Sequence, residues 1–383
     1  MRTSSRRDRS GASSEMTAAV TSASKVPDGS IHKTWNRKNP PVLTIKPGEY
    51  VTFNAPDASG GEITPKTVGA DLARIDYRRL DPLMGPVYVD GVKPGDALKI
   101  ELVELKPVNW GWTALLPNFG LLAAEIRDPY LKIWELERDF IEMPNGARFD
   151  LRPMIGCIGV APGRDGDYAS ITPTNAAGNL DCRYLGPGST LVVPVSNEGA
   201  LLSATDGHAI QGDGEICGTG IECQMQMTLR VDVVRNAGLS APEVWARGGF
   251  EEAAGYRIFT GIGPDLMEAT KDAVRHCIAP LAKALKIDEI EAYAMTGLIA
   301  DLRILEIVDV PNWVVGCMLP RRLFEYLSQG RRRSIGPGYR EVRGCLFRDH
   351  AMTVRDVMCC LRANCGRARW ARCGAKAGDI RRR

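Results

Sequence analysis

The chain has little of several features that define common protein classes. Its 383 residues contain no apolar run of about eighteen residues, the length a helix needs to cross a bilayer. The first residues carry arginines but no continuous apolar segment of the kind found in secretory signals. These absences argue against a membrane-spanning helix and a secretory signal. We therefore expect a cytoplasmic protein that does not bind membranes.

Cysteine is present but is not spaced for a metal or disulfide scaffold. The cysteines before residue 331 show no Cys-x-x-Cys spacing; they are Cys157, Cys182, Cys217, Cys223, Cys277 and Cys317. This pattern is typical of reduced thiols in a cytosol. The chain also lacks a Gly-x-Ser-x-Gly elbow and a Ser-Ser-Lys pattern, which argues against two classes of serine-dependent hydrolase.

Charge is distributed unevenly, and the net charge of +3 hides this. Residues 331–383 hold 14 Arg and 1 Lys against 3 Asp and 1 Glu, a net charge of +11. Residues 1–26 carry +3, which leaves −11 for residues 27–330. We expect a disordered extension at 1–26, a folded body at 27–330 and a poorly ordered basic Cys/Arg-rich tail at 331–383. A basic tail can bind nucleic acid, but we expect a solvated tail and no nucleic-acid partner.

Most of the body has the pattern of β-strands. Residues 42–45 and 50–53 flank a Lys-Pro-Gly-Glu turn, and residues 97–105 alternate apolar and polar side chains. Residues 190–195 form a β-branched apolar run that is typical of a buried strand, and residues 199–204 are predicted as a second strand.

Two helices are expected late in the chain. The first begins at Pro264-Asp265 and should be kinked or split at Pro280. The second follows Asp288 and covers residues 289–300. Strand-rich sequence with two late α-helices predicts a mainly β architecture of the sandwich type.

One acidic stretch, residues 178–222, stands apart from the rest of the body. Its ionisable side chains lie among glycines; the main ones are Asp181, Asp206, His208, Asp213, Glu215 and Glu222. A packed core has no use for charge at this density, so the stretch is predicted to bind a metal or transfer protons. If the segment is extended, Asp206 and His208 share one face.

Blocks in and around this stretch resemble the acetamidase/formamidase family. They include Gly178-Asn179-x-Asp181, Gly188-Ser189-Thr190-Leu191, Asp206-x-His208-Ala209-x-Gln211-Gly212-Asp213-Gly214-Glu215, Cys217-Gly218-Thr219 and the earlier Gly85-Pro86-Val87-Tyr88-Val89-Asp90-Gly91. The resemblance covers roughly residues 30 to 325, and several long blocks in the right order make it specific. The family often has a histidine before its Pro-x-x-Gly-Pro block, where this chain has Asp81, so substrate range or metal affinity is expected to differ.

The resemblance implies hydrolysis of formamide, acetamide and similar short linear amides to a carboxylate and ammonia. It also implies a jelly-roll-like β-sandwich with added strands and a homo-oligomeric assembly. A bound divalent metal can activate water for such a reaction. One imidazole and two carboxylates suit zinc, with calcium as the alternative ion. The predicted ligands are Asp181, His208 and Glu215, with Asp181 included because the family block carries it.

Further roles follow from the same stretch. Asp206 and Asp213 are each predicted as a further ligand or as the general base, and with Glu215 they form the predicted catalytic set. Asn179 and Trp112 are predicted to contact the substrate. Trp112 belongs to residues 110–120, which form either a mobile loop beside the site or a packed loop over a sheet edge.

Two alternatives to a metal–water amidase remain open at this point. Cys217 lies two residues after Glu215 and can serve as a nucleophile. The fold can also be a non-catalytic β-sandwich whose metal only holds the acidic loop. An open metal position beside a pocket would favour the enzyme.

Overall fold

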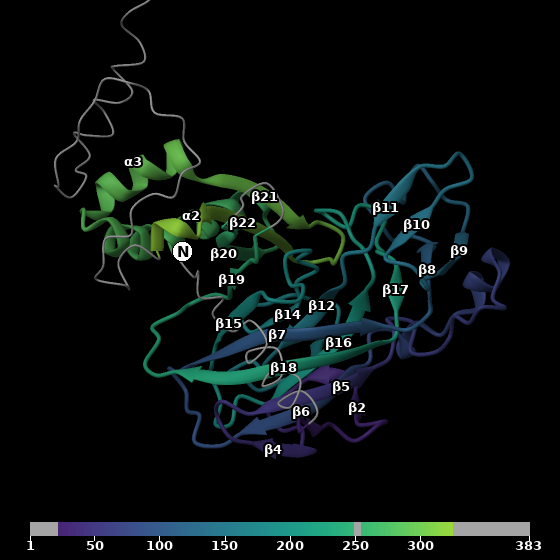
Figure 1. Cartoon of the computed structure of the whole chain (residues 1–383), viewed down its shortest axis with the longest axis horizontal. Helices are drawn as coiled ribbons and strands as arrows, with labels where there is room; N and C mark the ends of the chain where they lie inside the picture. The colour runs from purple at the N-terminus through teal and green to yellow at the C-terminus, as the bar shows by residue number, and fades with distance from the viewer. Residues whose placement is uncertain (1–21, 249–253, 325–383) are drawn as a thin grey trace, which may run out of the picture. The chain divides into compact units, whose positions relative to one another are not determined.

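Two large β-sheets form most of the part of the chain that this computed structural model describes, residues 22–248 and 254–324 (Figure 1). The predicted basic tail at 331–383 and residues 1–21 of the predicted extension lie outside the described residues. The predicted disorder of residues 24–26, at the end of that extension, is corrected. Ser24 and Lys25 pair with strand residues Val51 and Thr52, and Val26 is buried in the core.

Nine strands build the first sheet within the described residues. Their order across the sheet is β1 (Ser24–Lys25), β5 (Tyr50–Ala55), β18 (Met225–Val234), β7 (Ala97–Pro107), β15 (Thr190–Pro194), β19 (Glu243–Trp245), β20 (Tyr256–Gly263), β22 (Trp313–Pro320) and β21 (Asp301–Glu306). Apart from the parallel pair β1 and β5, neighbouring strands run antiparallel. Leu98, Ile100 and Leu102 of β7 point into the core, as the predicted alternation requires.

The second sheet also has nine strands in the described part of the chain. One path through it is β14 (Ala177–Asn179), β12 (Met154–Gly159), β16 (Leu202–His208), β17 (Glu222–Cys223), β8 (Trp110–Leu115) and β9 (Tyr130–Glu135); β6 (Leu83–Val89) pairs with β16 and with β2 (Ile31–His32) and β4 (Leu43–Ile45). Two small sheets pair β10 (Phe140–Glu142) with β11 (Arg148–Asp150), and β3 (Thr34–Trp35) with β13 (Tyr168–Ala169).

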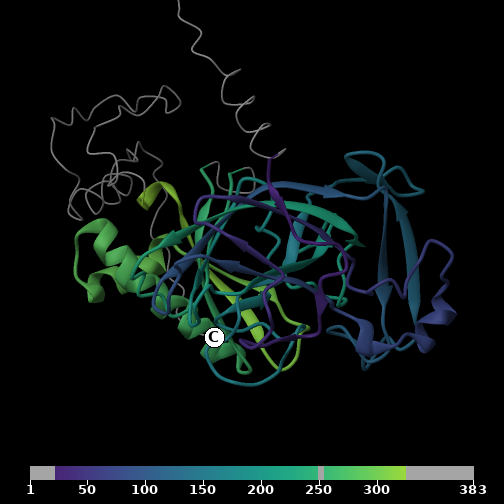
Figure 2. The same ribbon diagram turned by 90° about the horizontal axis from the view of Figure 1, so that it is seen from below.

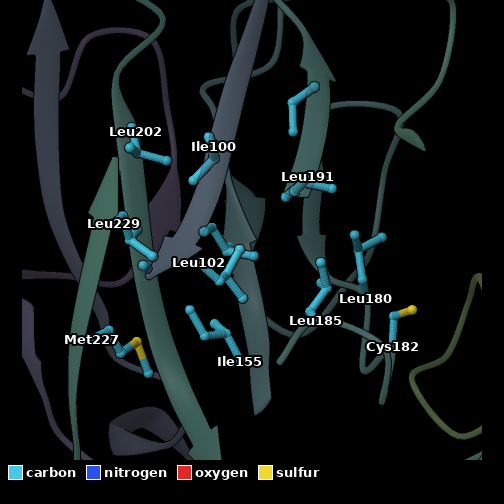
Figure 3. Packing of buried hydrophobic residues seen from close by; sticks show 14 of the residues in the cluster. Ile100, Leu102, Ile155, Leu180, Cys182, Leu185, Leu191, Leu202, Met227 and Leu229 are labelled. Carbon is cyan, nitrogen blue, oxygen red and sulfur yellow. The ribbon is translucent and has the colours of Figure 1, made fainter. Parts of the chain in front are cut away.

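The hydrophobic core lies between the two large sheets. Ile100 and Leu229 come from the first sheet, and Ile155 and Leu202 come from the second (Figure 3). All four are fully buried. This is the sandwich arrangement expected from alternating strands, so the predicted mainly β sandwich with added strands and two late helices is confirmed.

Helices α2 (Leu266–Leu285) and α3 (Glu289–Ile299) pack together, and α2 covers β20 and β22. They lie at the opposite end of the sandwich from β8 and β9 (Figures 1 and 2). Each helix has an aspartate cap: Asp265 accepts the Glu268 N–H at 2.8 Å, and Asp288 accepts the Glu291 N–H at 2.8 Å. No helix in residues 22–248 and 254–324 is long and apolar enough to cross a membrane.

Short 3₁₀ helices η1 (Gly69–Arg74) and η2 (Tyr77–Arg79) precede β6. Several local predictions are corrected. α2 continues through Pro280 rather than splitting there. The strand predicted to start at residue 199 begins at Leu202, because Ala200 and Leu201 each adopt a left-handed φ of 60°. Residues 110–115 form strand β8 rather than a loop.

Candidate functional site

A cavity of about 190 Å³ opens at one end of the second sheet. Its polar floor gathers residues from distant parts of the chain: Asn179, Asp181, Asp206, His208, Glu215, Glu222 and Asp309. All seven are buried. Charged groups at this depth need ligands, partners or protons, which marks the floor as the candidate site.

Strand register builds the centre of this floor. His208 at the end of β16 lies opposite Glu222 of β17, and Glu222 lies opposite Trp112 of β8. Gly207, between Asp206 and His208, leaves room for Met225, which a β-carbon at this position would approach within 2.5 Å. Strand β16 runs through Gly207 and ends at His208.

Backbone strain accompanies three of the acidic residues. Asp181, Asp206 and Glu215 have φ angles of 40°, 60° and 44°. Residues other than glycine rarely adopt this left-handed region, at a cost of roughly 1–3 kcal/mol each. Strain repeated at three residues that share one cavity floor is typical of a functional site.

His208 is held by side chains on both ring nitrogens. Nδ1 lies 2.7 Å from Gln211 Oε1, and the Gln211 amide donates to the Asp181 carbonyl, so Gln211 presents its oxygen and accepts the Nδ1 proton. Nε2 lies 3.1 Å from Asp206 Oδ1 in hydrogen-bond geometry, and 2.9 Å from Glu222 Oε2 without that geometry. Gln211 therefore fixes the ring and leaves Nε2 facing the carboxylates.

Burial and crowding shift the pKa values of this cluster. Burial lowers the pKa of His208, but the Glu222 and Asp206 carboxylates outweigh it and raise the pKa well above its ordinary value. Burial raises the pKa of Glu222 to about 7. Burial also raises the pKa values of Asp181 and Glu215 well above the ordinary range. Without a cation, the cluster keeps protons that carboxylates normally lose.

A second buried acidic pair supports the floor from β21. The Glu306 carboxylate accepts the backbone N–H groups of Val308 and Asp309, which fixes the turn after β21. This turn places Asp309 beside Asn179, whose amide donates to Asp309 Oδ2 at 2.7 Å. Burial and the charge of Glu306 raise the pKa of Asp309 well above its ordinary value.

The donor set fits a divalent cation. Two overlapping groups bring their ligand atoms within 4.8 Å of one another: Asp181, His208 and Glu215, and Asp206, His208 and Glu222. Both Asp181 carboxylate oxygens and Glu222 Oε2 are buried without a hydrogen-bond partner. Buried polar atoms are rarely left unsatisfied, so these oxygens are positioned for a cation.

Gly156 of β12 makes the carboxylate arrangement possible. A β-carbon at this position would lie 2.3 Å from Asp206 Oδ2 and 2.5 Å from Asp181 Oδ1. Only glycine allows both carboxylates to converge over this strand. The carboxylates thus meet in space made for them by the backbone.

A family model for the acetamidase/formamidase family matches residues 19–166 and 164–326. The chain belongs to the acetamidase/formamidase family. Its similarity to curated family members is modest in identity but extends over most of their length. A formamidase of Methylophilus methylotrophus is 24% identical over 370 residues, covering 78% of this chain and 90% of the relative. An acetamidase of Mycolicibacterium smegmatis is 24% identical over 306 residues, covering 62% of this chain and 75% of the relative.

Solved structures of family members have the same fold. An acetamidase from Bacillus halodurans superposes with a TM-score of 0.73 at 29% identity, covering 79% of this chain and 99% of that one. An acetamidase from Yersinia enterocolitica gives a TM-score of 0.71 at 30% identity, covering 79% of this chain and 93% of that one. The similarity thus extends over most of this chain.

The structure brings most of the predicted site residues together around one cavity. Asn179, Trp112 and the predicted ligands Asp181, His208 and Glu215 line the cavity, as does Asp206. Asp213 does not line it. Its carboxylate accepts hydrogen bonds from Tyr184 Oη and Arg303 Nη1, each at 3.2 Å. Asp213 therefore binds these side chains outside the cavity.

The structure also shows where Cys217 and Asp81 lie relative to the cavity. Cys217 is half-buried and is not among the cavity-lining residues; its thiol donates to the Thr219 carbonyl at 3.2 Å. Asp81, where the family often has histidine, lines the cavity. Burial and the charges of Asp206 and Glu222 raise the pKa of Asp81 to about 8.

Sequence reasoning missed Asp309 and left Glu222 outside the predicted ligand and catalytic sets. Asp309 lies 130 residues from its partner Asn179, so no local pattern links the two. Glu222 had a usable signal, because a strand after the acidic loop could return beside His208 in antiparallel register.

Proposed function

We propose that this chain hydrolyses formamide, acetamide and similar short linear amides at the buried acidic cavity, using water activated by a bound divalent ion. The chain is an amidohydrolase that acts on linear amides, in keeping with its family and with relatives named formamidase and acetamidase. The observation that carries the metal part of the proposal is the set of buried carboxylate oxygens around His208 that have no hydrogen-bond partner.

Asp181, His208 and Glu215 are the proposed ligands of the ion. When bound, the ion would lower the pKa of water and polarise the amide carbonyl. The absence of any Lys or Arg among the described residues lining the cavity supports a cation in this position. Zinc is the ion we propose, because it binds imidazole and carboxylate ligands and keeps an open position in catalytic sites.

Glu222 is the proposed proton carrier. Its Oε2 is buried in the cavity without a hydrogen-bond partner, 2.9 Å from Nε2 of His208. A carboxylate at this position can take a proton from the attacking water and return it to the leaving nitrogen. Asp206 is proposed to stay ionised, since His208 offsets the effect of burial and lowers the pKa of Asp206.

Asn179 is the proposed substrate-orienting residue. Its Nδ2 group is committed to Asp309, while its buried Oδ1 has no partner. That oxygen can accept an N–H of the substrate amide, which would orient the carbonyl carbon toward the ion. We also propose that Trp112 forms the adjoining apolar wall.

The test is ammonia release from formamide, acetamide and propionamide. We expect activity to disappear with a chelator and to return with zinc, and His208→Ala to remove both activity and zinc binding. Asp90→Asn, at an exposed turn after β6, is the control and should retain activity. Chelator-resistant activity that thiol alkylation abolishes would contradict the metal mechanism and favour Cys217.

A cytoplasmic location and a homo-oligomeric assembly are further parts of the proposal. Both follow from the sequence pattern and the resemblance described above. Light scattering of the purified full chain tests the assembly, with a mass of one chain, 41.8 kDa, as the contrary result.

A further inference from the structure

The cavity has two chemically different parts. Its floor is acidic, whereas its walls are mainly hydrocarbon; six wall residues are Ile63, Leu80, Trp112, Leu116, Phe119 and Ile171. Ile63 and Trp112 are almost fully buried, and Phe119 packs against Gly218 beside the acidic loop. A substrate that places its amide on the floor must therefore place its remaining atoms against these walls.

Two polar groups in the walls are already committed elsewhere, while Tyr77 and Asn118 also line the cavity. The indole N–H of Trp112 donates to Asp57 Oδ1 at 3.3 Å, so the ring presents carbon to the cavity. The Thr219 hydroxyl donates to the Ala114 carbonyl at 3.1 Å and accepts the Ala114 N–H at 3.2 Å. A polar substrate tail would lose its water here without gaining these two partners.

Negative charge on the tail is also unfavourable. The described residues lining the cavity include no Lys or Arg, while six carboxyl groups line it. An anionic tail would leave water and approach carboxylates, which is unfavourable at low dielectric. The walls therefore favour a neutral, apolar tail.

The cavity is larger than the smallest amides need. Its volume of about 190 Å³ corresponds to roughly six water molecules at about 30 Å³ each. Formamide has three heavy atoms, so it would leave much of the cavity wall without any contact to the substrate. Apolar surface that stays unfilled contributes nothing to binding.

We propose that the preferred substrates are neutral aliphatic amides with acyl chains of about four to six carbons, rather than formamide or acetamide. This inference rests on the proposed amidase function and narrows its substrate class. Each methylene that the walls remove from water should raise kcat/KM by about fourfold. Butyramide, with two more methylenes, should thus exceed acetamide by roughly fifteenfold.

The experiment compares kcat/KM for formamide, acetamide, butyramide and succinamate with the zinc-loaded full chain. Succinamate replaces the terminal methyl of butyramide by a carboxylate, so the two substrates differ in charge at nearly constant length. We expect kcat/KM to rise from formamide to butyramide and to fall at least tenfold for succinamate. We also expect butyrate to inhibit acetamide hydrolysis more strongly than acetate does.

Phe119→Ala tests the wall directly. It should reduce the butyramide-to-acetamide ratio, while Phe149→Ala, at an exposed aromatic outside this cavity, should leave the ratio unchanged. Hydrolysis of formamide or acetamide without a rise toward butyramide would overturn the inference and leave the proposed function standing. Equal rates for succinamate and butyramide would also overturn it. No ammonia from any amide would overturn both.

Discussion

A few individual residues of the candidate site account for most of the stability that the site costs the fold. Asp181, Asp206 and Glu215 combine positive φ angles with buried carboxyl groups, and none of these features helps the chain to fold. Local choices that oppose stability are expected at functional sites and are compensated elsewhere. In this chain the compensation comes from the close packing of the two sheets around them.

Gly156→Ala tests whether the carboxylates need the space above β12. The added methyl group would meet Asp206 Oδ2 and Asp181 Oδ1 and push them apart. We expect zinc affinity to fall at least tenfold and stability to fall by about 1–3 kcal/mol. Calorimetric titration of the chelated protein with zinc measures the affinity.

Gly212→Ala is the matched control, because it lies in the same acidic loop and a β-carbon there meets nothing within 4 Å. Its zinc affinity should equal that of the unaltered chain. Unchanged zinc affinity in Gly156→Ala would contradict the proposed ligand positions.

Strands and helices could be predicted where a single local sequence pattern is enough to determine them. The alternation of β7 and the aspartate caps of α2 and α3 gave the right elements. Proline did not split α2, because Pro280 lies near its C-terminal end and helix packing on β20 and β22 outweighs one lost hydrogen bond. Asp309 could not be placed, since strand pairing across the whole sheet brings it to the floor.

The contact between α2 and β20 depends on a single glycine. A β-carbon on Gly261 would lie 1.8 Å from the Ala269 carbonyl oxygen and 2.5 Å from the Ala273 nitrogen. Both atoms belong to helix backbone, so the whole helix must shift. We expect Gly261→Ala to lower the free energy of unfolding by about 3 kcal/mol, as overpacking does.

Gly263→Ala on the same strand meets nothing within 4 Å and serves as the control. Urea unfolding of both variants measures the difference. Equal midpoints would contradict the close approach of α2 to β20. Zinc affinity is expected to survive in Gly261→Ala molecules that remain folded, since the floor residues come from other elements.

At the scale of the whole molecule, the acidic cluster couples folding to protons and to the cation. Burial raises the pKa of Glu222 to about 7 from an ordinary 4.5, and the pKa of His208 is raised through its carboxylate neighbours. The folded metal-free protein therefore holds protons that the unfolded chain releases. These bound protons favour the folded state. Their contribution to the free energy of unfolding is fully present below the ordinary pKa values, and it is lost as pH rises through the pKa values of the folded protein.

Metal-free protein should consequently become less stable between pH 5 and pH 8, with Glu222 alone contributing about 1 kcal/mol per pH unit up to its folded pKa. Zinc competes with the same protons, so its stabilising effect should grow over this range. Thermal unfolding with chelator or with zinc measures both trends. Glu222→Gln should flatten the metal-free slope, whereas groups with lowered pKa values such as Asp96 act only at lower pH. A metal-free melting temperature that rises from pH 6 to pH 8 would contradict the proton-loaded cluster, and with it the view that a cation completes this fold.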